Sequence, residues 1–345
     1  MLMTTVGNYP KVAEGAYTTK LIGALTKWQR KELSNDQIET VYQEITRAVI
    51  QEQDQAGLDL VTDGQIRWED LVTPIAKRLE GFEINGLSRW FDNNVYYRRP
   101  ILRKAPKWTG PILVDDYQVA TRCTTKPVKA ILPGPYTFAR ASEDQYYHAE
   151  RPLVLKMAEL LNAEALALAR VGASFIQFDE PALGFGLPAT QPFRRSGLAR
   201  QAGKPNVKLA IEALGIVTKG LKAKTAVYTY FGSLNGMLEP LMRAKVDVVG
   251  LDVVTEPKTL GLLTRMKVAK ELALGCLDAR NTRLESVKDL HAMFDVIKKR
   301  VPLERLYVNP NCGLEFLPHA QALAKVRRLV QAVRTYRTSG RPQCS

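Results

Sequence analysis

The sequence feature that most constrains the fold is a series of eight short apolar segments, each with Gly, Pro, Asp or Asn at its end or next to it. Helical patterns follow most of them. Strands that alternate with helices in this way are typical of a (β/α)8 TIM barrel, which needs roughly 250 residues. We therefore expect an α/β fold with one barrel domain over residues 1–345. The expected strands are 3–8, 58–64, 128–134, 174–180, 226–232, 246–252, 272–278 and 305–312, and the expected helices are 35–56, 150–171, 206–222, 234–245, 257–269, 285–300 and 318–337.

Polar residues stand where these segments end, which is where a parallel barrel carries its chemistry. Any one of them can simply cap the helix that follows. As a set, with paired carboxylates, tyrosines and a thiol, they predict an active site. They include Asn8, Gln65, Asp179, Glu180, Tyr228, Tyr230, Asp252, Asp278, Arg280, Asn311 and Cys312.

Two stretches depart from the repeat. Residues 81–127 form an insertion between the second and third expected strands, and we expect a hairpin or arm there. Its segment RWFDNNVYYRRP (89–100) fits two interpretations, a surface that stacks on a flat heterocycle or a small satellite core. Residues 187–205 are rich in Pro, Gly and Arg, so we expect a mobile basic loop that orders on an anion.

The chain carries 49 Lys and Arg against 35 Asp and Glu, a formal charge of +14. This excess indicates either a polyanionic partner or a solvated basic surface. No nucleic-acid motif accompanies it. The four cysteines are far apart with no CxxC pair, no segment resembles a secretory signal, and no apolar run reaches the ~20 residues of a membrane span, so we expect free thiols and a cytoplasmic protein without membrane contact.

Several chemistries are excluded by what the strand ends lack. None of the three histidines stands at one of them, which argues against a Ser-His-Asp triad or a histidine-rich metal site. The chain also has no GxGxxG or GxxxxGK[ST] loop for nucleotide phosphates. Asp179 and Glu180 are adjacent on a strand, so their side chains point in different directions. We expect one to hold an ammonium or pterin N–H groups and the other to brace the turn.

Five segments together resemble the cobalamin-independent methionine synthase family. They are TTVGNYP (4–10), QEQDQAGLDLVTDGQ (51–65), LPGPYTFAR (132–140), FDEPALGFGLP (178–188) and YVNPNCGLEFLP (307–318). They occur in family order over nearly the whole chain. The resemblance implies a (β/α)8 barrel and methionine biosynthesis. The implied reaction transfers a methyl group from a folate or corrinoid donor, methyltetrahydrofolate or a methylcorrinoid, to the thiolate of homocysteine, which zinc activates.

The zinc ligands of that family are mostly replaced. Its His-x-Cys pair falls on Tyr228 and Tyr230, its glutamate on Asp252, and only its last cysteine is kept, as Cys312. Phenols with a pKa near 10 are poor zinc ligands at neutral pH. We therefore expect an atypical or absent zinc site, with Cys312 and Asp252 as the remaining metal candidates.

Other positions depart from the family as well. The acid that holds the homocysteine amino group falls on Gln65, and the general-acid histidine falls on Arg280. RWFDNNVYY and VYTYFG resemble the family's non-catalytic N-terminal barrel, which is thought to help hold the polyglutamate tail of folate. The chain thus resembles a stand-alone, single-barrel member that mixes two patterns.

Two hypotheses follow from these residues. The first is a methyltransferase acting on a thiol or related small acceptor, with catalytic residues Asp179, Tyr228, Tyr230, Asp252, Arg280 and Cys312 and substrate-binding residues Asn8, Gln65, Glu180 and Asn311. The second is a zinc-less binding paralogue that captures polyglutamylated folate or a corrinoid protein and assists a separate catalytic barrel.

Overall fold

The computed structural model describes residues 1–11, 16–89, 96–185, 205–234 and 236–339. Backbone contacts divide the chain into two compact units. Unit 1 comprises residues 1–67, 116–129 and 251–345, and unit 2 comprises residues 68–115 and 130–250. The basic loop expected at 187–205 lies outside the described residues except for Pro205. The aromatic residues Trp90 and Phe91 also lie outside them.

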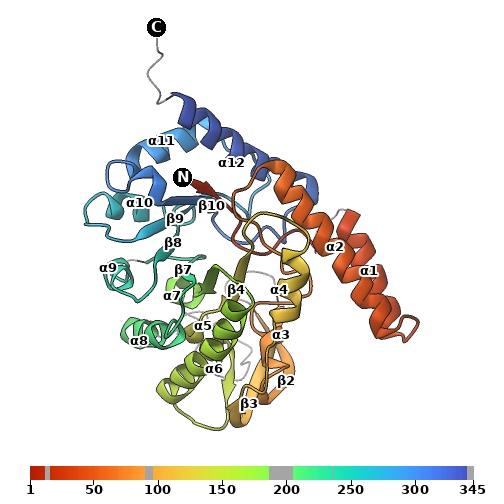
Figure 1. Cartoon of the computed structure of the whole chain (residues 1–345). Helices are drawn as coiled ribbons and strands as arrows, with labels where there is room; N and C mark the ends of the chain where they lie inside the picture. The colour runs from red at the N-terminus through yellow and green to blue at the C-terminus, as the bar shows by residue number, and fades with distance from the viewer. Residues whose placement is uncertain (12–15, 90–95, 186–204, 235, 340–345) are drawn as a thin grey trace, which may run out of the picture. The chain divides into compact units, whose positions relative to one another are not determined.

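Unit 1 contains three parallel strands with helices after them (Figure 1). β1 pairs with β10, and β10 pairs with β9, with Met3 opposite Val308 and Val308 opposite Leu274. β10 is buried along its whole length, as expected of a parallel strand covered on both faces. The elements are β1 (Leu2–Met3), α1 (Ala16–Gln29), α2 (Asn35–Ala56), α4 (Val114–Thr121), α10 (Lys258–Leu263), β9 (Glu271–Leu277), α11 (Val287–Ile297), a short 3-10 turn (Leu303–Arg305), β10 (Leu306–Pro310) and α12 (His319–Ser339).

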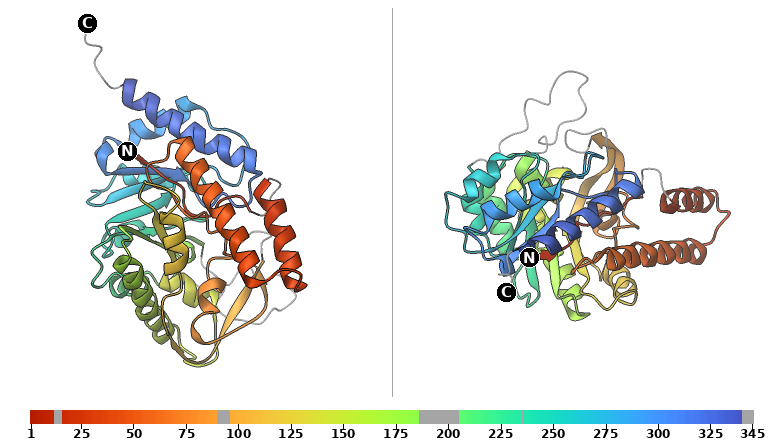
Figure 2. Two further views of the ribbon diagram at one scale, coloured as in Figure 1. Left: turned by 45° about the vertical axis from the view of Figure 1, so that its right-hand side comes forward. Right: turned by 90° about the horizontal axis from the view of Figure 1, so that it is seen from above.

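Local sequence signals explain the long helices of unit 1. α2 begins at the capping box formed by Ser34 and Gln37 and ends at Gly57, whose φ of 95° only glycine adopts readily. Its buried Ile38, Ile45 and Val49 recur at helical spacing and form its inner face. Figure 2 shows α1 running alongside α2 in both views, and the two helices are in contact.

Unit 2 contains the strand order β4, β6, β7, β8, with Asp179 opposite Tyr228 and Tyr228 opposite Gly250. β6 and β8 are buried throughout. The elements are α3 (Thr73–Ala76), β2 (Glu80–Arg89), β3 (Tyr96–Lys107), β4 (Lys129–Pro133), α5 (Pro135–Ala141), β5 (Glu143–Asp144), α6 (Glu150–Arg170), β6 (Phe175–Asp179), α7 (Pro181–Phe185), α8 (Val207–Val217), β7 (Lys224–Tyr228), α9 (Leu238–Met242) and β8 (Val248–Asp252).

The insertion at 81–127 contains an antiparallel hairpin of β2 and β3, in which Phe82 lies opposite Leu102. Tyr97 is buried, and its hydroxyl donates to the carbonyl of Ala141 at 2.7 Å, whereas Tyr96 is 56% exposed. Tyr97 is therefore part of a packed core, and of the two tyrosines only Tyr96 offers an exposed ring.

Most of the expected strands are shorter than the sequence indicates, and three of them need comment. Residues 58–64 form only an isolated bridge between Val61 and Val128. The reason is that the side chain of Gln53 takes the hydrogen bonds of the Thr62 backbone N–H and carbonyl, which a neighbouring strand would otherwise take. Gln53 Oε1 accepts from the Thr62 N–H at 3.0 Å, and Gln53 Nε2 donates to its carbonyl at 2.8 Å. The strand expected at 226–232 ends at Tyr228, and Phe231 takes a left-handed φ of 69° that extended chain does not have. The strand expected at 3–8 covers only Leu2–Met3.

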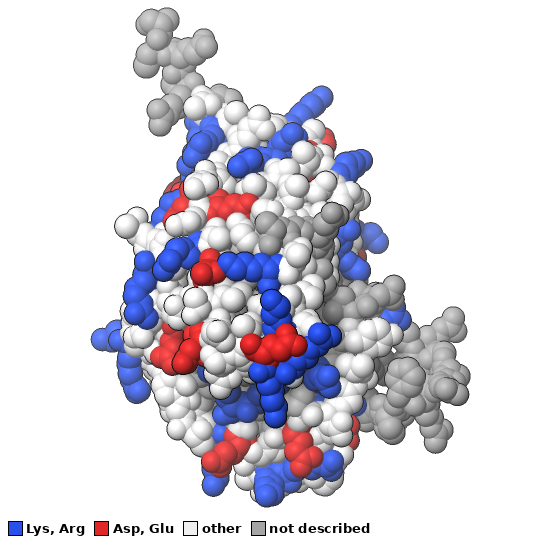
Figure 3. Space-filling view, turned by 90° about the vertical axis from the view of Figure 1, so that its right-hand side faces the viewer, with Lys and Arg blue, Asp and Glu red and all other residues white. Residues whose placement is uncertain are grey.

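Figure 3 shows one face of the molecule, on which acidic side chains lie among the basic ones. Some of the positive charge is also paired, since Arg67 contacts Glu39 at 2.6 Å and Asp116 at 2.8 Å. This face is therefore not an uninterrupted basic patch. Within the described ranges, no helix combines the length and apolar character needed to cross a membrane.

Candidate active site

The end of β6 holds a carboxylate in a fixed position. Asp179 is 2% exposed. Its Oδ1 accepts from Gln177 Nε2 at 2.6 Å, and its Oδ2 accepts from the Tyr230 hydroxyl at 3.0 Å. Gln177 stands two residues earlier on the same face of the strand, and Tyr230 comes from the segment after β7. The structure thus brings together two residues that the sequence singled out, Asp179 and Tyr230.

Glu180 points elsewhere and holds the start of α5. Its two oxygens accept from the N–H groups of Tyr136 at 2.9 Å and Thr137 at 2.7 Å. Gly134 leaves room for this carboxylate, since a Cβ there would lie 2.1 Å from Glu180 Cδ. Burial raises the pKa of Glu180 to about 7, against the opposing effect of these hydrogen bonds. Glu180 therefore braces the turn, and a substrate contact by it stays a prediction.

Tyr228 is the last residue of β7 and is 2% exposed. Its ring packs on Gly250 of β8, where a Cβ would lie 2.6 Å from Tyr228 Cγ. The packing explains why a glycine stands in the middle of a buried strand.

In unit 1, Asn311, which follows β10, links two neighbouring turns. One turn begins at Asp252 after β8, and the other contains Ala279 after β9. Asp252 Oδ1 accepts from the N–H groups of Val254 at 3.0 Å and Thr255 at 2.8 Å, and its Oδ2 accepts from Asn311 Nδ2 at 3.3 Å. Asn311 Oδ1 in turn accepts from the Ala279 N–H at 2.9 Å. Burial raises the pKa of Asp252, and the hydrogen bonds oppose that rise. The side-chain oxygen and nitrogen of Asn311 are both hydrogen-bonded within the protein, so the contacts of Asn311 are structural.

Cys312 is 2% exposed and directly follows Asn311. Burial, and then the negative charges of Glu315 and Asp252, raise the pKa of its thiol well above the ordinary value, and the charge of Arg280 opposes this only in part. In the absence of a cation, a thiol in such surroundings is protonated at neutral pH and is a weak nucleophile.

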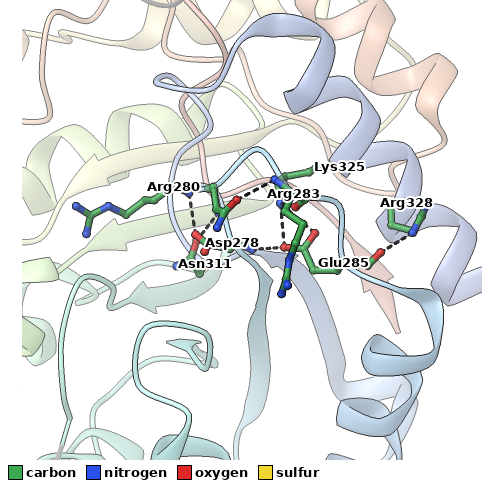
Figure 4. A network of polar contacts seen from close by, with 9 residues as sticks. Asp278, Arg280, Arg283, Glu285, Asn311, Lys325 and Arg328 are labelled. Carbon is green, nitrogen blue, oxygen red and sulfur yellow. Dashed lines mark hydrogen bonds and ion pairs between the residues drawn. The ribbon is translucent and has the colours of Figure 1, made fainter.

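Figure 4 shows the network that shapes the loop carrying Arg280. Lys325, which is 0% exposed, donates to both oxygens of Glu285 at 2.9 and 3.0 Å and to the carbonyl of Arg283 at 2.6 Å. Glu285 Oε1 also accepts from the Asp278 N–H at 2.8 Å. The guanidinium of Arg280 extends away from this network. Sequence reasoning missed Lys325 and Glu285, because a lysine within one helix and a glutamate just before another carry no signal of pairing across 40 residues.

Asn8 and Gln65 belong to a third group of polar residues, also in unit 1. Lys11, which is buried, donates from Nζ to Asn8 Oδ1 at 3.0 Å and to the Gln65 carbonyl at 2.5 Å. The carboxylate of Glu315 approaches Gly313, where a Cβ would lie 2.1 Å from Glu315 Oε2 and 2.9 Å from Asn8 Cβ. We call Asn8, Lys11, Gln65 and Glu315 the amide–lysine cluster. Lys11 and Glu315 were not singled out from the sequence, although both stand inside segments that were.

The residues at the expected zinc positions do not fit that metal. Tyr230 is hydrogen-bonded to Asp179, and Tyr228 is packed under its neighbouring strand. Asp252 accepts from backbone N–H groups, and the Cys312 thiol is the only thiol among these four positions. Among the residues that the structure describes, no three His, Cys, Asp or Glu side chains gather as a metal site. We derive no chemical step through zinc.

Comparisons with known proteins identify the family to which this α/β chain belongs. The model of the cobalamin-independent synthase catalytic domain matches residues 1–335. The chain therefore belongs to the cobalamin-independent methionine synthase family, as its sequence motifs predict, and this family is one of methyltransferases.

Relatives cover nearly the full length of the chain. The methionine synthase of Saccharolobus solfataricus is 28% identical over 344 residues, which cover 97% of this chain and 94% of that protein. The methionine synthase of Sulfolobus acidocaldarius is 28% identical over 330 residues, covering 95% and 90%.

Solved structures support the fold class. The B12-independent methionine synthase of Shewanella sp. W3-18-1, solved in complex with selenomethionine, matches with a TM-score of 0.80 at 22% identity, covering 98% of this chain and 99% of that one. A methyltransferase from Methanosarcina mazei matches with a TM-score of 0.61 at 13% identity, covering 96% and 94%. The predicted α/β TIM-barrel class is thereby confirmed.

Proposed function

We propose that this protein transfers a methyl group from a folate or corrinoid donor to a homocysteine-like thiol, without the zinc ion that ordinarily activates the thiol in its family. Family membership and relatives named methionine synthase support the reaction class. The Shewanella relative was solved with selenomethionine, a methylated amino acid of the kind the reaction would produce. The observation that carries the proposal is Asp179, which is buried and held by Gln177 and Tyr230 at a strand end.

Asp179 is suited to receive N–H groups of a substrate amine or of a pterin. Two hydrogen bonds fix its carboxylate, so little reorganisation is needed when a ligand binds. Tyr230 acts through Asp179, because its hydroxyl donates to Oδ2 and sets the direction of the carboxylate. Arg280, in unit 1, is exposed, and its role in catalysis stays a prediction.

Without zinc, the thiol must lose its proton to a base. A thiol has an ordinary pKa of about 8.5, so accepting its proton is a modest task for a carboxylate base at a strand end. The proton then goes from sulfur to the carboxylate, and a sulfur lone pair forms the S–CH3 bond. The electron pair of the broken N–CH3 or Co–CH3 bond stays on the donor.

A second candidate is the zinc-less binding paralogue that holds polyglutamylated folate or a corrinoid carrier for a separate catalytic barrel. The mismatch between the residues at the zinc positions and zinc chemistry favours it. The two candidates differ in whether the isolated protein turns over.

A product assay separates the two candidates. Purified protein is incubated with methyltetrahydrofolate or methylcobalamin and with homocysteine or other small thiols, and methylated thiol is measured. We expect product in at least one combination, and about 10- to 100-fold less with Asp179→Asn, which removes a charged acceptor. Asp295→Asn, on the surface of α11, is the matched control and should act as wild type. Tight binding of polyglutamyl folate with no product in any combination supports the binding paralogue instead.

A further inference from the structure

A buried ion pair holds the loop between β9 and α11, residues 278–285 (Figure 4). The Lys325 side chain is 0% exposed, and its ammonium has three protons for three acceptors. These acceptors are the Arg283 carbonyl at 2.6 Å and the two carboxylate oxygens of Glu285 at 2.9 and 3.0 Å. Lys325 lies within α12 and Glu285 just before α11, so the pair ties one helix to the loop that precedes another.

Hydrogen bonds lead from this ion pair to Arg280. Glu285 Oε1 also accepts from the Asp278 N–H at 2.8 Å, and Asp278 Oδ1 accepts from the Arg280 N–H at 2.9 Å. Between these two residues, the Ala279 N–H donates to Asn311 Oδ1 at 2.9 Å. Side-chain acceptors therefore fix three consecutive backbone N–H groups, and the backbone at Arg280 is held in one position.

Stability alone does not explain this ion pair. Removing two charges from water costs about as much as their attraction returns, and apolar side chains of similar size are often equally stable in their place. Apolar side chains lack the donor and acceptor that the backbones of Arg283 and Asp278 use here. Residues 280–284 of the loop are all exposed and add no apolar core. The ion pair thus fixes the course of the loop.

Arg280 is the residue whose position matters most in this loop. Its side chain is exposed, and its guanidinium extends away from the network (Figure 4). It follows the end of β9, and its charge opposes the raised pKa of the Cys312 thiol after the neighbouring parallel strand β10. A guanidinium forms two parallel hydrogen bonds with a carboxylate only when it is correctly placed. Homocysteine and methyltetrahydrofolate both carry carboxylates.

We propose that Lys325 and Glu285 are positioning residues, which act through Asp278 to hold Arg280 where its guanidinium binds a carboxylate of a substrate. The inference rests on the proposed function, because it takes its substrates from that reaction. Lys325 and Glu285 touch no substrate in this account, and both lie outside the strand-end set that the sequence indicated.

Calorimetric binding tests the role of Arg280. Homocysteine is compared with 3-aminopropane-1-thiol, which lacks its carboxylate, and methyltetrahydrofolate is compared with its diester, which lacks both carboxylates. We expect Arg280→Gln to weaken binding of one carboxylate ligand about 10- to 100-fold and to leave its carboxylate-free analogue unchanged. The ligand that loses affinity is the source of the carboxylate. Arg283→Gln, which removes another exposed arginine of the same loop, is the matched control and should bind as the wild type does.

Combined variants test the positioning role. Lys325→Met with Glu285→Leu replaces the ion pair by apolar side chains of similar size, so the protein should still fold while the loop loses its anchors. We expect about 5- to 10-fold weaker binding of the same ligand. Adding Arg280→Gln to this double variant should weaken binding no further than Arg280→Gln alone does, because the pair acts only through Arg280. A purely structural role predicts that the two losses multiply.

A second pair of variants leaves the buried charges in place. Asp278→Ala removes the acceptor of the Arg280 N–H, whereas Asp278→Asn removes the same charge and keeps an oxygen there. We expect Asp278→Ala to bind the carboxylate ligand about 3- to 10-fold more weakly than Asp278→Asn. This comparison replaces the double variant if circular dichroism shows that the double variant does not fold.

The inference is overturned if the wild type binds neither carboxylate ligand at millimolar concentration, or if Arg280→Gln weakens ligands and analogues equally or weakens none. Losses that multiply in the triple variant, or equal binding by Asp278→Ala and Asp278→Asn, also overturn it. Product formation with a KM that Arg280→Gln leaves unchanged contradicts the inference but not methyl transfer. Non-additive loss of binding in a protein that forms no product supports the inference and contradicts methyl transfer.

Discussion

The carboxylate pair after β6 and the amide–lysine cluster are both buried and polar, yet the protein treats them differently. Glu180 has backbone donors on both oxygens, and Asp179 accepts from Gln177 and Tyr230. Gln65 and Glu315 keep buried polar atoms with no partner in the described residues. A carboxylate that the protein satisfies with backbone donors, as it does for Glu180, stabilises a turn, whereas a buried group that it leaves unsatisfied is favourable only when a ligand supplies the missing bonds.

The largest expected effect concerns Glu180. Glu180→Ala removes two charge-assisted hydrogen bonds and leaves two buried N–H groups of α5 unpaired, so we expect a loss of about 3 kcal/mol or more in the free energy of unfolding. Urea denaturation measures it. Glu180→Gln keeps one acceptor and should lose less. A loss below about 1 kcal/mol would show that the carboxylate does not hold the turn.

The second effect is the pH dependence of the same residue. The folded-state pKa of Glu180 is raised from 4.5 to about 7, so between these values the folded state holds a proton that the unfolded state has released. Its contribution to stability therefore falls as the pH rises through this window. Other carboxylates whose pKa is raised by burial, such as Asp252, titrate with the same sign, so the readout is the difference in unfolding free energy between wild type and Glu180→Gln. From pH 5 to pH 8, the unfolding free energy of the wild type should fall relative to that of Glu180→Gln. A rise relative to the variant would contradict the cause assigned to the raised pKa.

The smallest effect tests the unpaired side of the comparison. Gln65→Met keeps the length of the side chain and removes an unsatisfied amide, so we expect stability to stay equal or to rise by up to about 1 kcal/mol. Thermal or urea unfolding without ligand measures it. A clear loss of stability would mean that the amide is already satisfied within the protein.

The sequence predicted the elements whose signals are local. The helix expected at 35–56 matches α2, whose ends are fixed by a capping box and by Gly57, and β6, β8 and β10 were expected from apolar runs that parallel strands bury on both faces. The prediction of a strand at 58–64 was wrong, because the side chain of Gln53 in α2 takes backbone hydrogen bonds of Thr62 that a neighbouring strand would otherwise make. No local sequence pattern reveals that a side chain will take the hydrogen bonds of a strand.

The candidate site was predictable in outline. Asp179 and Glu180 have the separate environments expected of adjacent strand residues, and the structure shows Tyr230 hydrogen-bonded to Asp179. Lys11 and Glu315 could not be found in this way, because whether a buried polar atom lacks a partner depends on the packing of segments that are distant in the chain. Roles in catalysis for the strand-end residues stay predictions.

Methyl transfer without zinc is the central claim, and one measurement tests it directly. Protein stripped of metal by a chelator, with its zinc content checked by atomic spectroscopy, is supplied with methyltetrahydrofolate and homocysteine, or with methylcobalamin and homocysteine, and methionine is quantified. We expect methionine to form at the same rate whether zinc is withheld or added back. Methionine that forms only after zinc is restored, with zinc bound at one ion per chain, would contradict the account.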